Sequence, residues 1–175
     1  MRSLVGVAIA AVCCAGLAGC GQESMLDAGP MVLGGFDVPA GFKTVRQGYV
    51  GRLRLHYNVE YENRLTNAGY IDSTAVIERN PKAAQAWLNR FGRNIIKHHG
   101  RRLKRGAPLG DWHRVYVVPN QNHDPAIVLV LWRQGQVSAV VVRGIGGGEA
   151  VTVGSAMALA GVEARNIEQQ VANTP

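Results

Sequence analysis

The densest group of side chains that could do chemistry lies in residues 97–105, where five formal positive charges fall within nine residues. The five are Lys97, Arg101, Arg102, Lys104 and Arg105. Such a run can dock an anion, and Arg90 and Arg93 would extend it by one or two helical turns. It also has an ordinary structural explanation, because each cation stabilises a helix C-terminus by ~0.3–1 kcal/mol. Both interpretations stay open at the level of sequence.

Five histidines raise the question of a metal site. His98 and His99 are adjacent, so on a helix they point about 100° apart and do not easily share one ion. His113 and His123, with Asp124, could converge from a strand and a loop, but no pair at i and i+4 and no HExxH spacing supports them. The sequence therefore predicts no metal site, and these three residues are the candidates if the protein is an enzyme.

Motifs for nucleophiles and cofactors are incomplete. Ser155 lacks the second glycine of G-x-S-x-G, and the sparse carboxylates form no obvious acid/base pair. The glycine-rich loop 144–148 lies between a predicted strand and a predicted helix, where phosphates can bind. Glu149 stands where a dinucleotide fingerprint needs glycine, and no Gly-Lys-Ser/Thr follows. We therefore predict no catalytic residue and no cofactor.

The first twenty residues have the organisation of an export signal. Arg2 provides a positive start, and residues 4–17 carry no charge. An apolar run of about 14 residues is shorter than the ~20 that span a bilayer as a helix. This pattern predicts a removable signal rather than a membrane-spanning helix.

The end of this signal, Leu17-Ala18-Gly19-Cys20, resembles the lipobox of bacterial lipoproteins. The resemblance covers these twenty residues only and indicates no family for the rest of the chain. It implies a signal peptide over residues 1–19, a diacylglycerol on the sulfur of Cys20, and a fatty acid such as palmitate on the new amine. Two or three such chains anchor a protein essentially permanently. An uncleaved anchor, or a cysteine that ends an apolar run by chance, is the alternative.

Location follows from the same resemblance. Gly21, rather than Asp, follows the lipidated cysteine, and in a Gram-negative cell this implies the periplasmic face of the outer membrane. Removal of residues 1–19 leaves 156 of the 175 residues, enough for one domain with a real core, and no cysteine beyond Cys20. The formal charge falls from +7 to +6 with the loss of Arg2, which favours anionic partners, while export makes nucleic acid an unlikely one.

Residues 20–41 are predicted to be the lipidated cysteine and a tether, whose apolar Met31, Val32, Leu33 and Phe36 could dock onto the domain. Residues 52–61 alternate apolar and polar side chains, which predicts a half-buried strand with a mainly basic wet face. Residues 42–50 are its lead-in or a separate strand. Residues 70–78 could be the returning strand.

Asn80 and Pro81 begin a predicted helix over residues 81–99, with an apolar side chain every three or four residues. Strands follow at 112–118, 126–132 and 137–142, the last two as a central hairpin, and a second helix covers about 151–171. This order predicts an α+β fold for a single domain over residues 42–175. We expect a mainly antiparallel sheet of about five strands, with two helices packed on one face.

These observations favour a binding or assembly module over an enzyme. We expect a lipid-anchored protein of the cell envelope that uses its basic segment and the exposed face of its sheet. A protein of the envelope is the first expected partner, and an anionic lipid or polysaccharide is the second. The alternative is an envelope enzyme that acts on a glycan or peptide through His113, His123 and Asp124.

Overall fold

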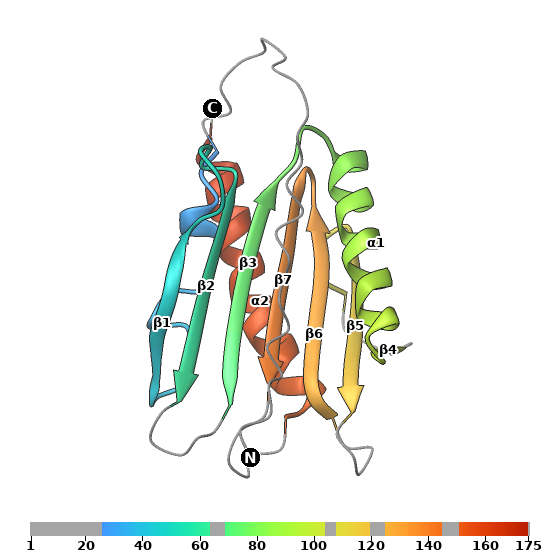
Figure 1. Ribbon diagram of the computed structural model, residues 1–175. Coiled ribbons are helices and arrows are strands. Elements are labelled where there is room, and N and C mark those ends of the chain that lie inside the picture. Colours follow the sequence, from blue (N-terminus) through green and yellow to red (C-terminus); the bar gives the residue numbers. More distant parts are fainter. Residues whose placement is uncertain (1–25, 64–68, 104–107, 120–124, 145–150, 175) are drawn as a thin grey trace.

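A seven-stranded antiparallel sheet forms the centre of the domain, with one long helix on each face (Figure 1). The computed structural model describes residues 26–63, 69–103, 108–119, 125–144 and 151–174. The strand order is β1-β2-β3-β7-β6-β5-β4. The elements are the 3₁₀ helix η1 (Gly29–Met31), β1 (Phe42–Tyr49), β2 (His56–Asn63), β3 (Tyr70–Ile77), α1 (Pro81–Lys97), β4 (Arg101–Leu103), β5 (Trp112–Pro119), β6 (Pro125–Gln134), β7 (Val137–Gly144) and α2 (Val153–Ala172).

The hairpin β6–β7 lies at the middle of the sheet, as its nearly continuous apolar sequence predicts. A two-residue turn joins the strands, and Gly135 adopts a φ of 55° there, a left-handed conformation that favours glycine. β7 pairs with β3 on its other side, so both strands of the hairpin are interior strands. Buried strands need apolar side chains on both faces, which is why the alternation seen in residues 52–61 is absent here.

The two helices pack on opposite faces, and the expectation that they share one face is wrong. Successive side chains of β6 and β7 point to opposite sides of the sheet, and both sets are apolar, so each side needs its own cover. α1 packs on one set and α2 on the other (Figure 1). The set beneath α1 comprises Tyr116, Leu129, Leu131, Val140 and Val142. The set beneath α2 includes Val115, Val117, Val128, Val130, Trp132, Ala139 and Val141.

Helix α1 begins where the sequence predicts. The side chain of Asn80 accepts a hydrogen bond from the Ala83 N–H at 2.9 Å, and Pro81 occupies the first helical position. The helix ends at Lys97, two residues earlier than expected, and His99 takes a φ of 67° beyond it. Helix α2 begins similarly, with the Thr152 hydroxyl accepting from the Ser155 N–H at 3.1 Å.

The sheet has seven strands rather than about five. Residues 42–49 form β1 as a separate strand, which is one of the two possibilities that the sequence leaves open. The short strand β4 pairs with β5 and lies within the basic segment 97–105, where no strand was expected. β2 begins at His56, so Arg52 and Arg54 lie in the preceding turn instead of on its wet face. That face carries His56, Asn58, Glu60 and Glu62, and the expectation of a mainly basic face is therefore wrong.

Part of the expected tether belongs to the folded domain. Four apolar side chains between residues 28 and 33, and Val38, are buried against β2, β3 and α2, which is more than the loose docking expected of a tether. The four are Ala28, Met31, Val32 and Leu33. Phe36, which was expected to dock with them, is fully exposed. The ordered domain thus begins well before residue 42.

Candidate functional site

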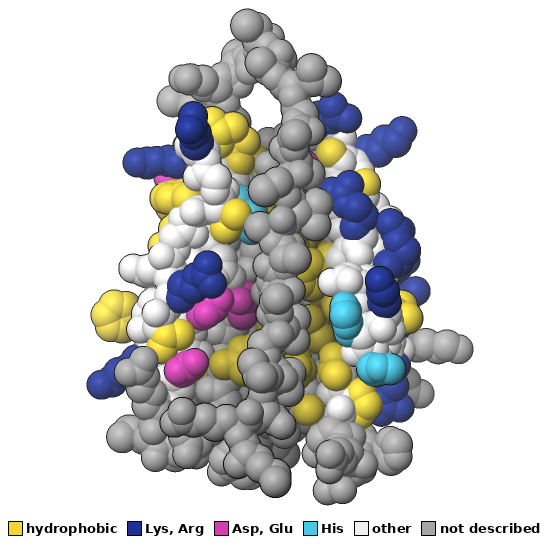
Figure 2. Space-filling model, viewed as in Figure 1, with side chains coloured by type: hydrophobic (Ala, Val, Ile, Leu, Met, Phe, Trp, Pro, Cys, Tyr) yellow, Lys and Arg dark blue, Asp and Glu magenta, His cyan; other side chains and the backbone are white. Residues whose placement is uncertain are grey.

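A basic surface covers the outer side of α1 and continues onto β4. Residues 79–110 contain nine Lys or Arg and no Asp or Glu. The structure describes seven of these cations, all exposed, and we define the basic surface by the six that lie on the α1 side or at the start of α1. They are Arg79, Lys82, Arg90, Arg93, Lys97 and Arg102. Figure 2 shows Lys and Arg side chains gathered over α1 on this side of the molecule.

The helix geometry aligns four of these cations. At about 100° per residue, Lys82, Arg90, Arg93 and Lys97 fall within about 80° of one another around the axis of α1. The buried residues Ala84, Leu88 and Ile95 occupy the opposite side, facing the sheet. The amphipathic pattern of α1 therefore packs an apolar stripe on the sheet and presents four aligned cations to the solvent on the opposite side.

The charges of the basic surface are not neutralised within the described part of the chain. The ion pairs found there join Arg46 to Glu60, Arg54 to Asp27 and Arg133 to Asp111. None of them involves a residue of the basic surface. Unneutralised like charges repel one another and so do not stabilise the fold, whereas they attract anions. Such a surface is therefore suited to bind an anionic partner.

The predicted run 97–105 is not one patch. Arg102 pairs with Tyr116 and lies on the α1 side, whereas Arg101 pairs with Val117 and lies on the α2 side. Lys104 and Arg105 lie outside the described residues. The sequence signal that identifies the larger surface is the absence of carboxylates over residues 79–110, rather than the local density of Lys and Arg.

The histidines do not converge in the described part of the chain. His98 and His99 are exposed at the end of α1, and His56 lies on β2, where burial lowers the pKa of its imidazole. His113 pairs with Trp132 and lies on the α2 side of β5, while His123 and Asp124 lie outside the described residues. Among the described residues, no group of three His, Cys, Asp or Glu could hold a metal ion.

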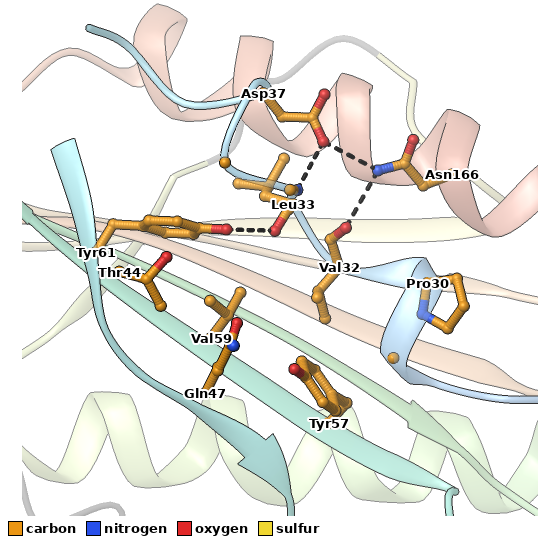
Figure 3. Close-up of a pocket in the computed structure, with 13 residues that line it drawn as sticks. Pro30, Val32, Leu33, Asp37, Thr44, Gln47, Tyr57, Val59, Tyr61 and Asn166 are labelled. Carbon is orange, nitrogen blue, oxygen red and sulfur yellow. Dashed lines mark hydrogen bonds between the residues drawn. The ribbon is translucent and has the colours of Figure 1, made fainter. Parts of the chain in front are cut away.

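A recess of about 330 Å³ lies beneath residues 29–37 (Figure 3). Thr44, Gln47 and Tyr57 form its floor on β1 and β2, and Asn166 of α2 lies on the opposite side. Much of its polar lining is already bonded. The Asp37 carboxylate accepts from the Gly34 N–H at 2.7 Å and from the Asn166 amide at 3.4 Å. We therefore interpret the recess as part of the packing interface between the N-terminal segment and the sheet.

A polar cluster lies on β2 and β3, on the same side of the sheet as α1. The amide of Asn58 donates to the Asp72 carboxylate at 3.0 Å and to the Thr74 hydroxyl at 2.9 Å. Burial raises the pKa of Asp72 to about 6, although the hydrogen bonds from Asn58 and Thr74 act in the opposite direction. Glu60, directly opposite Asp72, adds a second carboxylate. This part of the sheet is thus acidic, and it does not extend the basic surface.

Comparisons with known proteins give no relative. No family model, no characterised protein and no solved structure matches the chain. None of the helices described is long and apolar enough to cross a membrane. The site must therefore be interpreted from its own chemistry.

Proposed function

We propose that this chain is a lipid-anchored protein of the bacterial cell envelope that binds an anionic partner through its basic surface. The observation that carries the proposal is the carboxylate-free stretch 79–110, whose described cations are exposed and form none of the ion pairs above. The lipobox-like sequence ending at Cys20 supports the location. An exported protein meets acidic proteins and acidic polymers, and either offers the negative charge that this surface requires.

The geometry of α1 indicates the shape of that partner. Lys82 and Lys97 are separated by fifteen helical positions, which corresponds to ~23 Å along the axis. Cations spread over this length match an extended acidic surface better than a small anion, which would contact only one or two of them. We therefore favour an acidic face of an envelope protein, with an acidic polymer as the next candidate.

Charge reversal tests the proposal. The variant Arg93→Glu/Lys97→Glu removes two cations from the centre and the end of the stripe, and Lys43→Glu/Arg165→Glu changes the net charge equally at exposed sites elsewhere. Binding of the full-length protein to immobilised polyglutamate is measured at low and high salt. We expect the first variant to lose roughly thirtyfold in affinity at low salt, since each of the two cations near an anionic surface contributes about 1 kcal/mol.

The control variant should bind like the unmodified protein. Circular dichroism confirms that both variants are folded, which matters because Glu near the end of α1 interacts unfavourably with the helix dipole. Equal losses of affinity in the two variants would mean that binding depends on net charge alone. Unchanged affinity in both variants would contradict a role of the basic surface in binding. Crosslinking in intact envelopes with the same two variants shows whether any partner protein that is captured in a salt-sensitive manner requires the cations of α1.

A further inference from the structure

The turn between β1 and β2, residues 50–55, combines exposed apolar and basic side chains. The Val50 N–H donates to the His56 carbonyl at 2.9 Å and closes the turn. Leu53 and Val50 are 67% and 42% exposed, and Arg52 is exposed between them. Leu and Val side chains next to Arg suit a lipid–water interface, where the apolar groups enter the acyl boundary and the guanidinium stays among the phosphates.

The same turn is fastened to the point where the N-terminal segment enters the domain. The Ala28 N–H donates to the Arg54 carbonyl at 2.9 Å. The Asp27 carboxylate accepts a hydrogen bond from the Tyr49 hydroxyl at 2.6 Å and forms an ion pair with Arg54 at 3.2 Å. Burial acts to raise the pKa of Asp27, but the hydrogen bonds from Tyr49, Gly29 and Arg54 outweigh it and hold this pKa below its usual value.

Chain length then limits how far this turn can lie from a lipid on Cys20. Asp27 follows Cys20 by seven residues. An extended chain covers at most ~3.6 Å per residue, so the fastened turn cannot be more than about 25 Å from the lipidated cysteine. Three more large apolar side chains outside this turn and β1 are exposed among the described residues: Phe36, Ile96 and Val171. Phe36 lies in the loop beside α2 and Ile96 near the C-terminal end of α1, both away from this attachment, and Val171 lies in the last turn of α2.

We infer that the β1–β2 turn rests on the membrane that holds the lipid of Cys20, with Val50 and Leu53 in the acyl boundary and Arg52 at the phosphates. The inference relies on the lipid anchor of the proposed function. It adds a second, non-covalent contact, which fixes the orientation of the domain. A lipid alone would leave the domain free to rotate about its tether.

This orientation directs the C-terminal part of the basic surface away from the membrane. β3 runs antiparallel to β2, so the β1–β2 turn and the start of α1 lie at the same end of the sheet (Figure 1). α1 has 17 residues, so Lys97 lies ~24 Å along the axis from Pro81, towards the opposite end. Arg102 also lies well away from the turn, in the row of paired residues that contains Asp72 and Glu60. Both cations would face a partner in the aqueous space.

Fluorescent labels at three positions test the inference. After signal cleavage, Cys20 is the only cysteine and is blocked by acylation, so Leu53→Cys, Phe36→Cys and Ile96→Cys each give one reactive thiol at an exposed site. The full lipidated protein carries the NBD dye at each site in turn. It is reconstituted in phosphatidylethanolamine–phosphatidylglycerol vesicles with or without doxyl-labelled lipid, which quenches dyes in the acyl region.

We expect quenching at position 53 to be roughly threefold or more stronger than at positions 36 and 96, because only the turn enters the acyl boundary. Equal quenching at all three positions, none at any, or the strongest quenching at position 96 would overturn the inference. The last result would mean that the domain lies on α1.

The mass of the mature protein separates this inference from the proposal on which it relies. A mature mass without acyl chains removes both the anchor and the inference. A lipidated protein whose position 53 is not quenched removes the inference alone. Binding to polyglutamate, measured on the same preparations, continues to report the basic surface independently.

Discussion

Glu163 and Ser73 connect α2 to β3 and to the N-terminal segment through a chain of buried hydrogen bonds. The Ser73 hydroxyl is hydrogen-bonded to the Glu163 carboxyl group and accepts from the Leu33 N–H at 3.0 Å. The Tyr61 hydroxyl donates to the Leu33 carbonyl at 2.7 Å. Ser73 and Glu163 are both fully buried, so no substrate reaches them. Their role is to hold residues 28–38 against the sheet.

Burial raises the pKa of Glu163 well above its usual value, although the hydrogen bond with Ser73 lowers it in part. The nearby carboxylates of Asp72 and Asp37 raise it further. The folded protein therefore binds this proton more tightly than the unfolded chain does. Stability from this group is complete below the unfolded pKa of about 4.5 and is lost as the pH rises towards the folded pKa. Protonation of Asp72 contributes to stability in the same way, and this contribution is lost as the pH rises from its unfolded pKa of 3.8 to its folded pKa of about 6.

Glu163→Gln tests this assignment. Glutamine keeps the shape of the protonated acid, and its amide oxygen can still accept the hydrogen bond from the Ser73 hydroxyl. We therefore expect little change in the free energy of unfolding at pH 4. At higher pH the variant should become the more stable protein. The difference grows by up to about 1.4 kcal/mol per pH unit until the folded pKa is reached. Urea denaturation at several pH values measures it.

Glu168→Gln is the matched control, since Glu168 is exposed on the same helix. It should leave the pH dependence of the free energy of unfolding unchanged. If Glu163→Gln follows the unmodified protein at every pH, the buried carboxyl group does not titrate as described.

At the scale of the element, α1 shows how close packing constrains a helix whose outer side is free for function. Gly92 lies over β5, and a Cβ at this position would lie 2.3 Å from the Tyr116 hydroxyl oxygen and 3.0 Å from the adjacent ring carbon. Tyr116 is buried, so its ring has little freedom to move. Glycine destabilises a helix by up to about 1 kcal/mol relative to alanine. Here the absence of a Cβ at Gly92 allows α1 to approach the sheet closely.

Two glycine substitutions distinguish close approach from helix propensity. We expect Gly92→Ala to lower the free energy of unfolding by about 1–3 kcal/mol through overpacking. Gly161 lies in α2, where a Cβ would meet nothing nearer than an Arg165 nitrogen at 4.0 Å. Gly161→Ala should therefore stabilise the protein by about 0.5–1 kcal/mol. Thermal denaturation compares the two, and a stabilising Gly92→Ala would contradict the packing of α1 on Tyr116.

At the scale of the whole molecule, the N-terminal segment is a structural part of the domain. Met31 and Leu33 are fully buried, and each such side chain contributes about 1.5–3 kcal/mol of hydrophobic stabilisation. Asp27 ties the beginning of the segment to the β1–β2 turn. If Cys20 carries the lipid proposed above, only a short tether separates that lipid from the fold, which supports the membrane contact inferred above.

Truncation tests the boundary of the domain. A chain that begins at residue 42 loses this segment and leaves the Ser73–Glu163 pair and Tyr61 without the Leu33 backbone. We expect it to be unfolded or close to it, because the lost contacts approach the ~5–15 kcal/mol that stabilises a typical domain. A chain that begins at residue 26 should unfold cooperatively with a normal urea midpoint. Equal midpoints for the two chains would restore residues 26–41 to the role of a tether.

The sequence by itself determines those features that depend on neighbouring residues. The start of α1 at Asn80 and Pro81, the buried strands β6 and β7 and the α+β class are all confirmed, because caps, periodicity and turn residues act locally. The signal and the lipid on Cys20 stay predictions, since they lie outside the described residues. The local density of Lys and Arg predicts the basic segment 97–105, and the larger surface can be found in the sequence only through the absence of carboxylates over residues 79–110.

Only the tertiary structure decides which surfaces share a side of the molecule. It places the helices on opposite faces, separates Arg101 from Arg102, and buries Glu163 among residues distant in sequence. These outcomes depend on strand order and register, which arise from long-range pairing that no local pattern encodes. A stripe of charge on one helix can be read from the sequence. The direction in which this stripe faces, relative to the proposed membrane attachment, depends on the strand order of the sheet.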